Sequence, residues 1–333
     1  MNTWLSFLGS HSGQFHDGDQ ISFGEQASDY ESLAEQATFS PLLDRGVLSV
    51  SGADTDKLLQ GQLTCDLSQL GVGGSLPGAL CDNKGRVIST FLALRPDEQR
   101  VLLVMHKDIV SSTLETLKKY AVFYKTTLED LSSDYRVFGL NNISDPGELF
   151  LYGGLTGQLG LGLVTASDAL TAWGALANKY TAAGTGLWQY LAIRNGIGEV
   201  RPETQGEFIP QMLNLQHTGA VNFRKGCYTG QEIVARMQYL GKLKRRMYRL
   251  DIDSAAAIAP GTAIHRDGKS DVGTVVLSER SGPSSQSALA VLTAEAAQAS
   301  SLIFGDIDAA LQLQPLPYDD KFMDGTSPGA NGA

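Results

Sequence analysis

The stretch of this chain that decides its interpretation is residues 224–232, which read Arg224-Lys225-Gly226-Cys227-Tyr228-Thr229-Gly230-Gln231-Glu232. Thr229 and Glu232 have the spacing of a capping box, in which the hydroxyl accepts from the third helical amide and the carboxylate returns to the cap. Apolar side chains then recur at helical spacing up to Gly241, a residue typical of a helix end. The stretch therefore predicts a helix that begins just after Cys227.

Cys227 would lie at the positive end of that helix, two residues after Lys225. A helix N-terminus and a nearby ammonium both favour a thiolate over a thiol, so we interpret Cys227 as a candidate functional residue that Lys225 tunes. The flanking glycines allow the backbone to approach a ligand closely. A buried structural cysteine in a loop of small residues is the alternative. The spacing leaves both interpretations open.

The composition is typical of a globular protein of two or three domains. The chain has 333 residues, 42% hydrophobic and 19% charged, and a net charge of −10. Its three cysteines have neither CxxC spacing nor an even count, so we expect reduced thiols, no metal site and a cytoplasmic protein. We find no secretory leader and no apolar run long enough to span a membrane.

Positive charge is concentrated in one part of this acidic chain. Residues 224–249 hold one acid, Glu232, and eight cations: Arg224, Lys225, Arg236, Lys242, Lys244, Arg245, Arg246 and Arg249. Such a patch could bind a carboxylate-rich or phosphate-rich ligand, although most of these side chains are equally explained as a solvated surface. The overall acidity argues against direct binding of tRNA, which stays an alternative.

The order of predicted elements indicates an α+β fold with four regions. Residues 1–38 are polar and predict a flexible N-terminal arm. Residues 39–241 mix helices with strands, including a tight hairpin at Asn83-Lys84-Gly85, and predict two α+β lobes. Alternating strands over 242–317 predict a small β-barrel, and 318–333 have the composition of a disordered tail.

The motif at 225–232, continued by Val234-Ala235-Arg236, resembles the folate-binding YgfZ family, bacterial relatives of the aminomethyltransferase (T-protein) of glycine cleavage. Supporting runs include 59–64 (LQGQLT), 81–86 (CDNKGR) and 208–211 (FIPQ). The resemblance implies mixed α/β lobes around a central channel that holds a tetrahydrofolate. It also implies a factor that supports iron–sulfur enzymes, among them those that thiomethylate tRNA, with Cys227 as the residue most associated with that role.

Departures from the aminomethyltransferase pattern argue against aminomethyl transfer. Ser89 stands where those enzymes have a catalytic aspartate, and a hydroxyl cannot stabilise a developing ammonium as a carboxylate does. Arg194 stands where they have an acid that binds the pterin. A folate-dependent one-carbon transferase therefore stays the alternative to an accessory factor. Oxidase functions do not fit, because the chain has no flavin-binding domain.

The resemblance also assigns the folate contacts. Trp188 matches a tryptophan that contacts folate, although its apolar neighbours equally suit a core residue. Some relatives carry a tryptophan at Arg45, after the aspartate that matches Asp44; a guanidinium there could stack on the pterin or pair with a carboxylate. Gln231 is either a ligand contact or part of the first helical turn.

Overall fold

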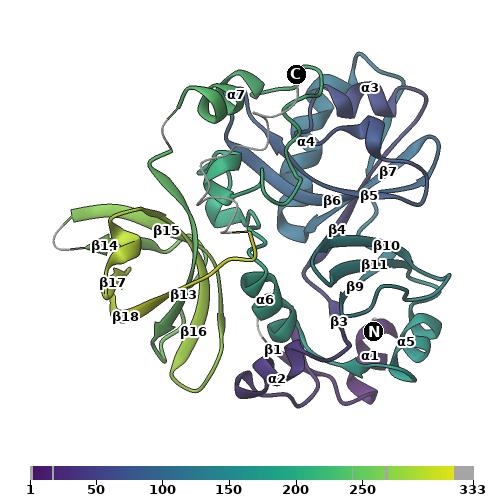
Figure 1. The fold of residues 1–333 in the computed structure, drawn as a ribbon. Helices are drawn as coiled ribbons and strands as arrows, with labels where there is room; N and C mark the ends of the chain where they lie inside the picture. The colour runs from purple at the N-terminus through teal and green to yellow at the C-terminus, as the bar shows by residue number, and fades with distance from the viewer. Residues whose placement is uncertain (1–2, 17–18, 242, 267–268, 319–333) are drawn as a thin grey trace.

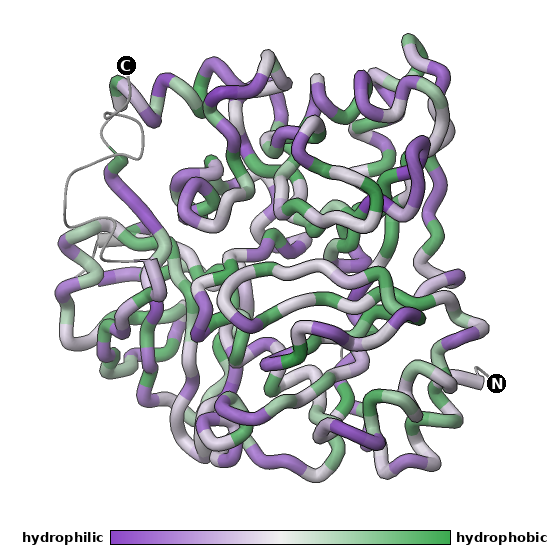
Figure 2. Tube along the Cα trace, turned by 45° about the vertical axis from the view of Figure 1, so that its right-hand side comes forward, coloured by the Kyte–Doolittle hydropathy of each residue, from purple (hydrophilic) through white to green (hydrophobic). Residues whose placement is uncertain are grey.

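The computed structural model describes residues 3–16, 19–241, 243–266 and 269–318 of the chain. Two β-sheets and a β-barrel lie around a central helix, α6 (Thr185–Arg194) (Figure 1). Within these ranges, no helix is long and apolar enough to cross a membrane. Figure 2 shows hydrophobic and hydrophilic segments alternating along the chain, as expected when each strand or helix buries one side.

The first sheet is fully antiparallel and has the order β5-β6-β7-β4-β8. Helices α3 (Thr55–Gln60) and α4 (Val110–Ala121) bury Leu58, Leu59 and Leu117 against one of its faces. The predicted hairpin at residues 83–85 joins β5 and β6, and Gly85 takes the positive φ that such a turn needs. The strands are β4 (Arg45–Ser51), β5 (Ser75–Cys81), β6 (Val87–Asp97), β7 (Arg100–His106) and β8 (Thr127–Asp130).

The second sheet has the order β10-β11-β9-β3-β12 and is antiparallel except at its β3–β12 edge. Its inner face shares a core with the first sheet and α6, while α5 (Ala169–Ala177) covers the outer face. Because β4 follows β3 after a two-residue turn, the chain passes directly between the sheets. The strands are β3 (Thr38–Leu42), β9 (Tyr135–Asn141), β10 (Leu151–Thr156), β11 (Leu159–Thr165) and β12 (Thr181–Ala182).

A closed six-stranded barrel, in the order β13-β16-β15-β14-β17-β18, confirms the predicted C-terminal module. Apolar side chains fill its interior, while Met247, Leu277 and Val291 pack outside it against the segment that follows α6. The strands are β13 (Arg245–Asp253), β14 (Ala263–Arg266), β15 (Lys269–Arg280), β16 (Ser285–Thr293), β17 (Ser301–Phe304) and β18 (Ile307–Gln314).

The remaining elements are short. The helices are α1 (Thr3–Ser10), α2 (Tyr30–Ala34) and α7 (Gln231–Tyr239), and a hairpin is formed by β1 (Gln14–His16) and β2 (Gln20–Ser22). Single 3₁₀ turns complete the list: η1 (Ala27–Asp29), η2 (Leu67–Gln69), η3 (Lys107–Ile109), η4 (Pro202–Thr204), η5 (Pro210–Leu213) and η6 (Ala296–Gln298).

The N-terminal segment differs from the flexible arm that its composition predicts. In α1, Trp4 and Leu8 are buried, and the Trp4 ring lies 5.8 Å from that of Phe138 and 6.1 Å from that of Trp173. The amide of Ile21 in β2 donates to Thr185 Oγ1 at the start of α6. The prediction was wrong because a few widely spaced apolar side chains anchor the segment, although its average composition is polar.

Tyr318, which the sequence assigned to the disordered tail, is packed in the structure. Tyr318 is buried, its hydroxyl donates to the carbonyl of Gly196, and its ring stacks on His217 at 5.5 Å. The rest of the predicted disordered tail, residues 319–333, lies outside the described residues. The chain therefore stays packed up to Tyr318 at least.

The contact between β9 and α6 generates a stability prediction. A Cβ added at Gly139 would lie 2.3 Å from Trp188 Cε3, so Gly139→Ala must displace the indole. We expect this variant to lower the free energy of unfolding by about 1–3 kcal/mol and to shift the tryptophan emission. Urea denaturation followed by fluorescence measures both.

Gly174→Ala in α5 is the matched control, because a Cβ there meets nothing within 4 Å. It should stabilise the protein by up to about 1 kcal/mol through helix propensity. Equal effects of the two alanines would contradict the packing of Trp188 on Gly139.

Candidate functional site

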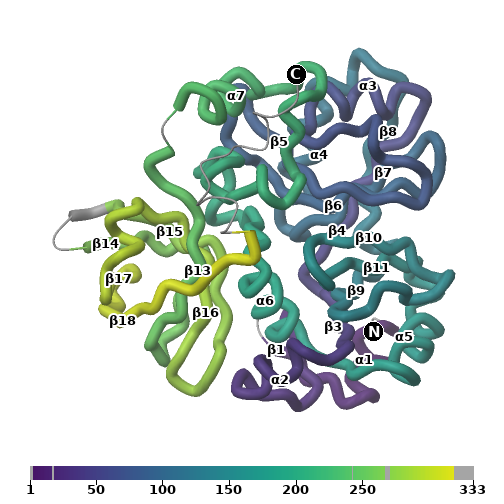
Figure 3. Tube along the Cα trace, viewed as in Figure 1, coloured from purple at the N-terminus to yellow at the C-terminus, as the bar shows by residue number. Residues whose placement is uncertain are grey.

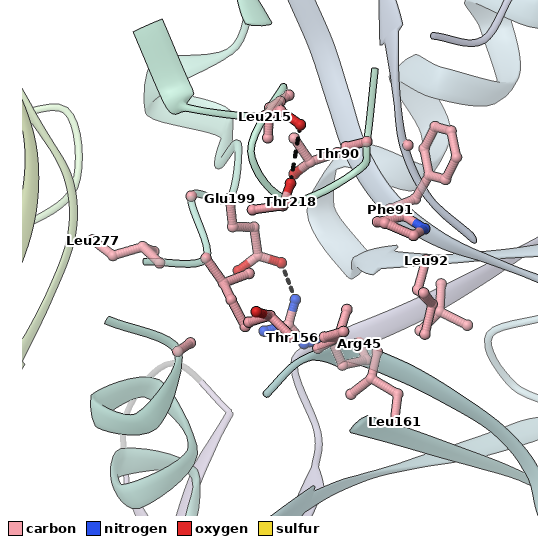
Figure 4. A pocket seen from close by; sticks show the side chains of 18 of the residues that line it. Arg45, Thr90, Phe91, Leu92, Thr156, Leu161, Glu199, Leu215, Thr218 and Leu277 are labelled. Atoms are coloured by element: carbon pink, nitrogen blue, oxygen red, sulfur yellow. Dashed lines mark hydrogen bonds and ion pairs between the residues drawn. The ribbon is translucent and has the colours of Figure 1, made fainter. Parts of the chain in front are cut away.

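A pocket opens where the two sheets, α6 and the barrel meet (Figure 4). It encloses about 760 Å³ with its open mouth included. Most lining side chains are apolar, and the polar ones are Arg45, Glu199 and three threonines. The full lining is Arg45, Pro77, Gly78, Thr90, Phe91, Leu92, Val104, Leu155, Thr156, Leu161, Trp188, Ala192, Ile197, Gly198, Glu199, Leu215, Thr218, Ala220 and Leu277. Such an apolar cleft with a few polar groups is typical of a small-molecule site.

Trp188 is both a core residue and a lining residue. It is 4% exposed and packs with the apolar side chains that join α6 to the two sheets, yet its ring also forms part of the pocket wall. Gly139 of β9 provides the space that the indole occupies. The two interpretations left open by the sequence are thus compatible, because core packing holds the ring that a ligand would meet.

Arg45 belongs to a closed ring of four charged side chains, which we call the ion ring: Asp44, Arg45, Glu199 and Arg201. Arg45 pairs with Asp44 (Nε to Oδ1, 3.4 Å) and, closely, with Glu199 Oε1. Arg201 pairs with the same two acids, at 3.4 Å to Asp44 Oδ2 and 3.0 Å to Glu199 Oε2. The side chains are 9–12% exposed, so each charge depends on its partners for compensation.

Burial and pairing act in opposite directions on these charges. Burial alone would raise the pKa of Asp44, but Arg45 and Arg201 hold it below its usual value. Burial lowers the pKa of Arg45 to about 10, which still leaves the guanidinium charged near neutral pH. The ring therefore carries two positive and two negative charges, and Figure 4 shows Arg45 and Glu199 pointing toward one another at the pocket.

Glu199 is the charged lining residue that sequence reasoning missed. The sequence does contain a pattern that could have indicated it. An acid and a base stand close together in Glu199-Val200-Arg201, just after Gly196 and Gly198, as they do in Asp44-Arg45. No local rule connects residues separated by more than 150 positions. The two pairs meet because β4 and the segment after α6 are brought together by the sheets.

Other predicted contacts lie away from the pocket. Arg194 pairs with Glu31 at 3.4 Å and with Glu35 at 2.9 Å. Gln231 opens α7 and does not line the pocket. Ser89 is fully buried and does not line the pocket either, whereas the next residue, Thr90, does.

The cysteine loop, residues 225–229, is anchored by Lys225. Its ammonium donates to the carbonyls of Gln60 (2.9 Å), Leu63 (2.6 Å) and Cys65 (2.7 Å). Gln60 is the last residue of α3, and the C-terminal end of a helix favours a cation. Burial lowers the pKa of Lys225 to about 8. All three ammonium donors are satisfied inside the protein.

Two further side chains fix the same loop. Tyr228 is buried, with the Lys225 ammonium 5.2 Å from its ring centroid. Thr229 donates through Oγ1 to Gln62 Oε1 at 2.9 Å. Gly230, the N-cap of α7, has a φ of 83°, and a Cβ there would lie 2.4 Å from the carbonyl oxygen of Asp82. Between these anchors, Gly226 and Cys227 are exposed to solvent.

This geometry corrects two predictions about Cys227. The ammonium of Lys225 is turned inward and donates to three carbonyls, so it does not serve the Cys227 thiol as a free neighbouring cation. The capping box is absent: α7 starts at Gln231 with Gly230 as its cap, and Thr229 bonds to Gln62 instead. Cys227 also does not line the pocket, so the loop and the cavity are separate sites.

One short segment connects the two sites. Thr64 donates through Oγ1 to the carbonyl of Ala220, which lines the pocket, and its own carbonyl accepts from the amide of Asn222. Asn222 Oδ1 in turn accepts from the amides of Arg224 and Lys225, at 2.8 and 3.1 Å. The pocket wall therefore braces the cysteine loop.

In the described part of the chain, no cluster of three or more His, Cys, Asp or Glu residues could hold a metal ion.

The exposure of the three thiols generates a second prediction. Burial raises the pKa of Cys65 to about 11 and that of Cys81 to about 12, whereas Cys227 is exposed. A thiol reagent such as DTNB should therefore modify one cysteine rapidly in the native protein and three after denaturation. Cys227→Ser should abolish the fast phase, and a fast phase that persists in this variant would contradict the placement of the loop.

The three carbonyl contacts of Lys225 generate a third prediction. Lys225→Met keeps the length and apolar stem of the side chain but leaves these buried acceptors without their donor. We expect the free energy of unfolding to fall by about 2–4 kcal/mol. Arg224→Met is the control, because Arg224 is exposed and the same substitution there should change stability little. Urea denaturation compares them, and equal stabilities would overturn the anchoring role.

The chain is similar to known proteins over most of its length. It is 32% identical over 304 residues to the tRNA-modifying protein YgfZ of Photobacterium profundum, covering 84% of this chain and 91% of that protein. It is also 32% identical over 305 residues to the protein of that name from Sodalis glossinidius, covering 84% and 93%. No protein-family model matches the chain.

A solved structure supports the fold. The glycine cleavage system aminomethyltransferase T from Bartonella henselae superposes with a TM-score of 0.73, covering 95% of this chain and 96% of that one, at 14% identity. This likeness confirms the predicted T-protein-like fold. The sequence similarity shows that the chain belongs to the family of the tRNA-modifying protein YgfZ.

Proposed function

We propose that this protein binds a tetrahydrofolate in the pocket between its sheets, α6 and barrel. The observation that carries the proposal is an apolar cavity that combines two aromatic residues, Phe91 and Trp188, with one ion pair, Arg45–Glu199. A pterin is a flat heterocycle with N–H donors and carbonyl acceptors on one edge. Apolar walls and Trp188 suit its faces, and the ion pair suits its edge.

The ion pair at the pocket offers polar atoms for such an edge. Asp44 Oδ1 and Arg45 Nε pair with each other at 3.4 Å, and neither these two atoms nor Arg201 Nε makes a hydrogen bond within the described part of the chain. Glu199 offers carboxylate oxygens beside the Arg45 guanidinium, which places an acceptor next to a donor. Because the ion ring has no net charge, a neutral ring system can bind there without leaving a charge uncompensated.

We propose that the bound folate acts as a ligand or a carrier of a one-carbon unit, and that this protein is an accessory factor and not an aminomethyltransferase. Ser89, at the position of the catalytic aspartate, is fully buried and does not line the pocket. The folate-dependent one-carbon transferase alternative therefore has less support.

The names of the relatives connect this fold to tRNA modification. We propose that the protein acts in the cytoplasm and supports iron–sulfur enzymes, including those that thiomethylate tRNA, through Cys227. The cysteine loop supports this role, since three side chains anchor it and leave the thiol accessible to a partner macromolecule.

Folate binding is tested by calorimetry with tetrahydrofolate under anaerobic conditions. Thr156→Trp fills the pocket from β10 and should weaken binding at least tenfold, which corresponds to about 1.4 kcal/mol. Gln158→Trp places the same ring on the exposed turn of that hairpin and should bind like the wild type. Absence of measurable binding by the wild type would end the folate proposal.

The role of Cys227 is tested separately, in a strain that lacks the protein. Cys227→Ser should bind tetrahydrofolate normally, because the thiol does not line the pocket, yet fail to restore tRNA thiomethylation. Full restoration by this variant would overturn the role of the cysteine while leaving folate binding intact.

A further inference from the structure

A surface around α7 combines exposed cations with exposed aromatic and aliphatic side chains. We call it the α7 surface, and it consists of Lys84, Arg224, Arg236, Tyr239, Leu240 and Lys244. Figure 3 shows α7 at the outer edge of the molecule, away from α6 in the centre. Neither the folate proposal nor the anchoring of the cysteine loop uses these side chains.

The cations of this surface lack partners in the protein. Lys84, Arg224, Arg236 and Lys244 are exposed and form no ion pair with any residue that the structure places. Arg245, by contrast, pairs with Asp271 at 3.1 Å. On a chain of net charge −10, four unpaired cations around one helix make a local field that attracts an anion.

These cations are spread along the length of α7. Gly85, next to Lys84, packs against Ile233 of α7, with 3.1 Å between a Cβ built at the glycine and Ile233 Cβ. The turn that carries Lys84 therefore lies beside the start of the helix, while Arg236 and then Lys244 follow toward and beyond its end. The positive charge extends along the helix and is not confined to one point.

The apolar part of the surface is aromatic and accessible. Tyr239 is 67% exposed and Leu240 is 86% exposed. The Tyr239 ring lies 6.1 Å from that of Phe223 at 73°, an edge-to-face contact that holds it in place. Arg236 precedes these residues by one helical turn, so it shares their side of α7.

From this combination we propose that the α7 surface binds a single-stranded region of RNA. Cations that contact phosphates, together with an accessible aromatic ring on which a base can stack, are the features of single-strand recognition. An acidic partner protein would also be attracted by the cations, but its binding would not require an exposed tyrosine that a second ring holds in place. The proposal deepens the tRNA side of the proposed function, on which it rests, and is independent of folate.

Fluorescence anisotropy with a fluorescein-labelled RNA hairpin that has an unpaired loop tests the proposal. Four phosphate contacts give a slope of about −2.8 in log K against log salt, so affinity should fall roughly 50-fold between about 50 and about 200 mM salt. Tyr239→Ala should weaken binding roughly 5- to 150-fold through lost stacking. Arg236→Glu should weaken it and flatten the salt dependence.

Matched controls use an exposed aromatic residue and an exposed cation at the end of α4. Phe123→Ala removes a ring that is 81% exposed, and Lys119→Glu reverses an exposed lysine. Both should bind the hairpin like the wild type. Equal binding of a fully paired RNA duplex, unchanged affinity in Tyr239→Ala, or displacement of the RNA by polyglutamate at equal charge concentration would each overturn the proposal. Calorimetry with tetrahydrofolate on the same variants keeps a failure here separate from a failure of the folate site.

Discussion

The buried ammonium of Lys225 is the interaction on which the arrangement of the cysteine loop depends. A cation leaves water only if its donors are satisfied, and here three carbonyls at and after the end of α3 satisfy them. These acceptors are more than 150 residues away in sequence, so the contact joins the loop to the first sheet. Lys225 is held inward, Tyr228 is buried and Thr229 bonds to Gln62, while the thiol of Cys227, between Lys225 and Tyr228, is exposed to solvent.

The ion ring imposes a second constraint, on the pocket. Asp44 and Arg45 follow β3, whereas Glu199 and Arg201 follow α6, so the ring fastens the two sheets to the segment that leads to the barrel. Each arginine contacts both acids. Removal of one member would leave a buried charge without its partner, which costs more than the net worth of the pair. The ring thus fixes the polar side of the pocket in one geometry before any ligand arrives.

The sequence predicts those features that local patterns encode. Alternation and turn residues reveal the β5–β6 hairpin and the barrel, and the motif at 225–232 marks the cysteine loop. What local patterns cannot encode is the direction of a side chain whose partners are distant in sequence. Lys225 therefore seemed to serve Cys227, two residues away, when it serves carbonyls at 60–65. Glu199 escaped notice for the same reason, and Trp4 and Leu8 were masked by the polar residues around them.

The separation of the two sites bears on the chemistry that the protein can perform. Group transfer between a folate carbon and a sulfur needs the reacting atoms within about 3–3.5 Å of each other. Cys227 lies outside the pocket wall, and bringing it in would break the three hydrogen bonds of Lys225 and the contact between Thr229 and Gln62. Each bond lost from a buried group costs about 1–3 kcal/mol, and no compensating contact for the inward position is evident. The geometry therefore supports the proposed division of roles, in which the cavity would hold a small ligand while the thiol would face a partner. The Thr64 segment is hydrogen-bonded to both sites and therefore connects them structurally.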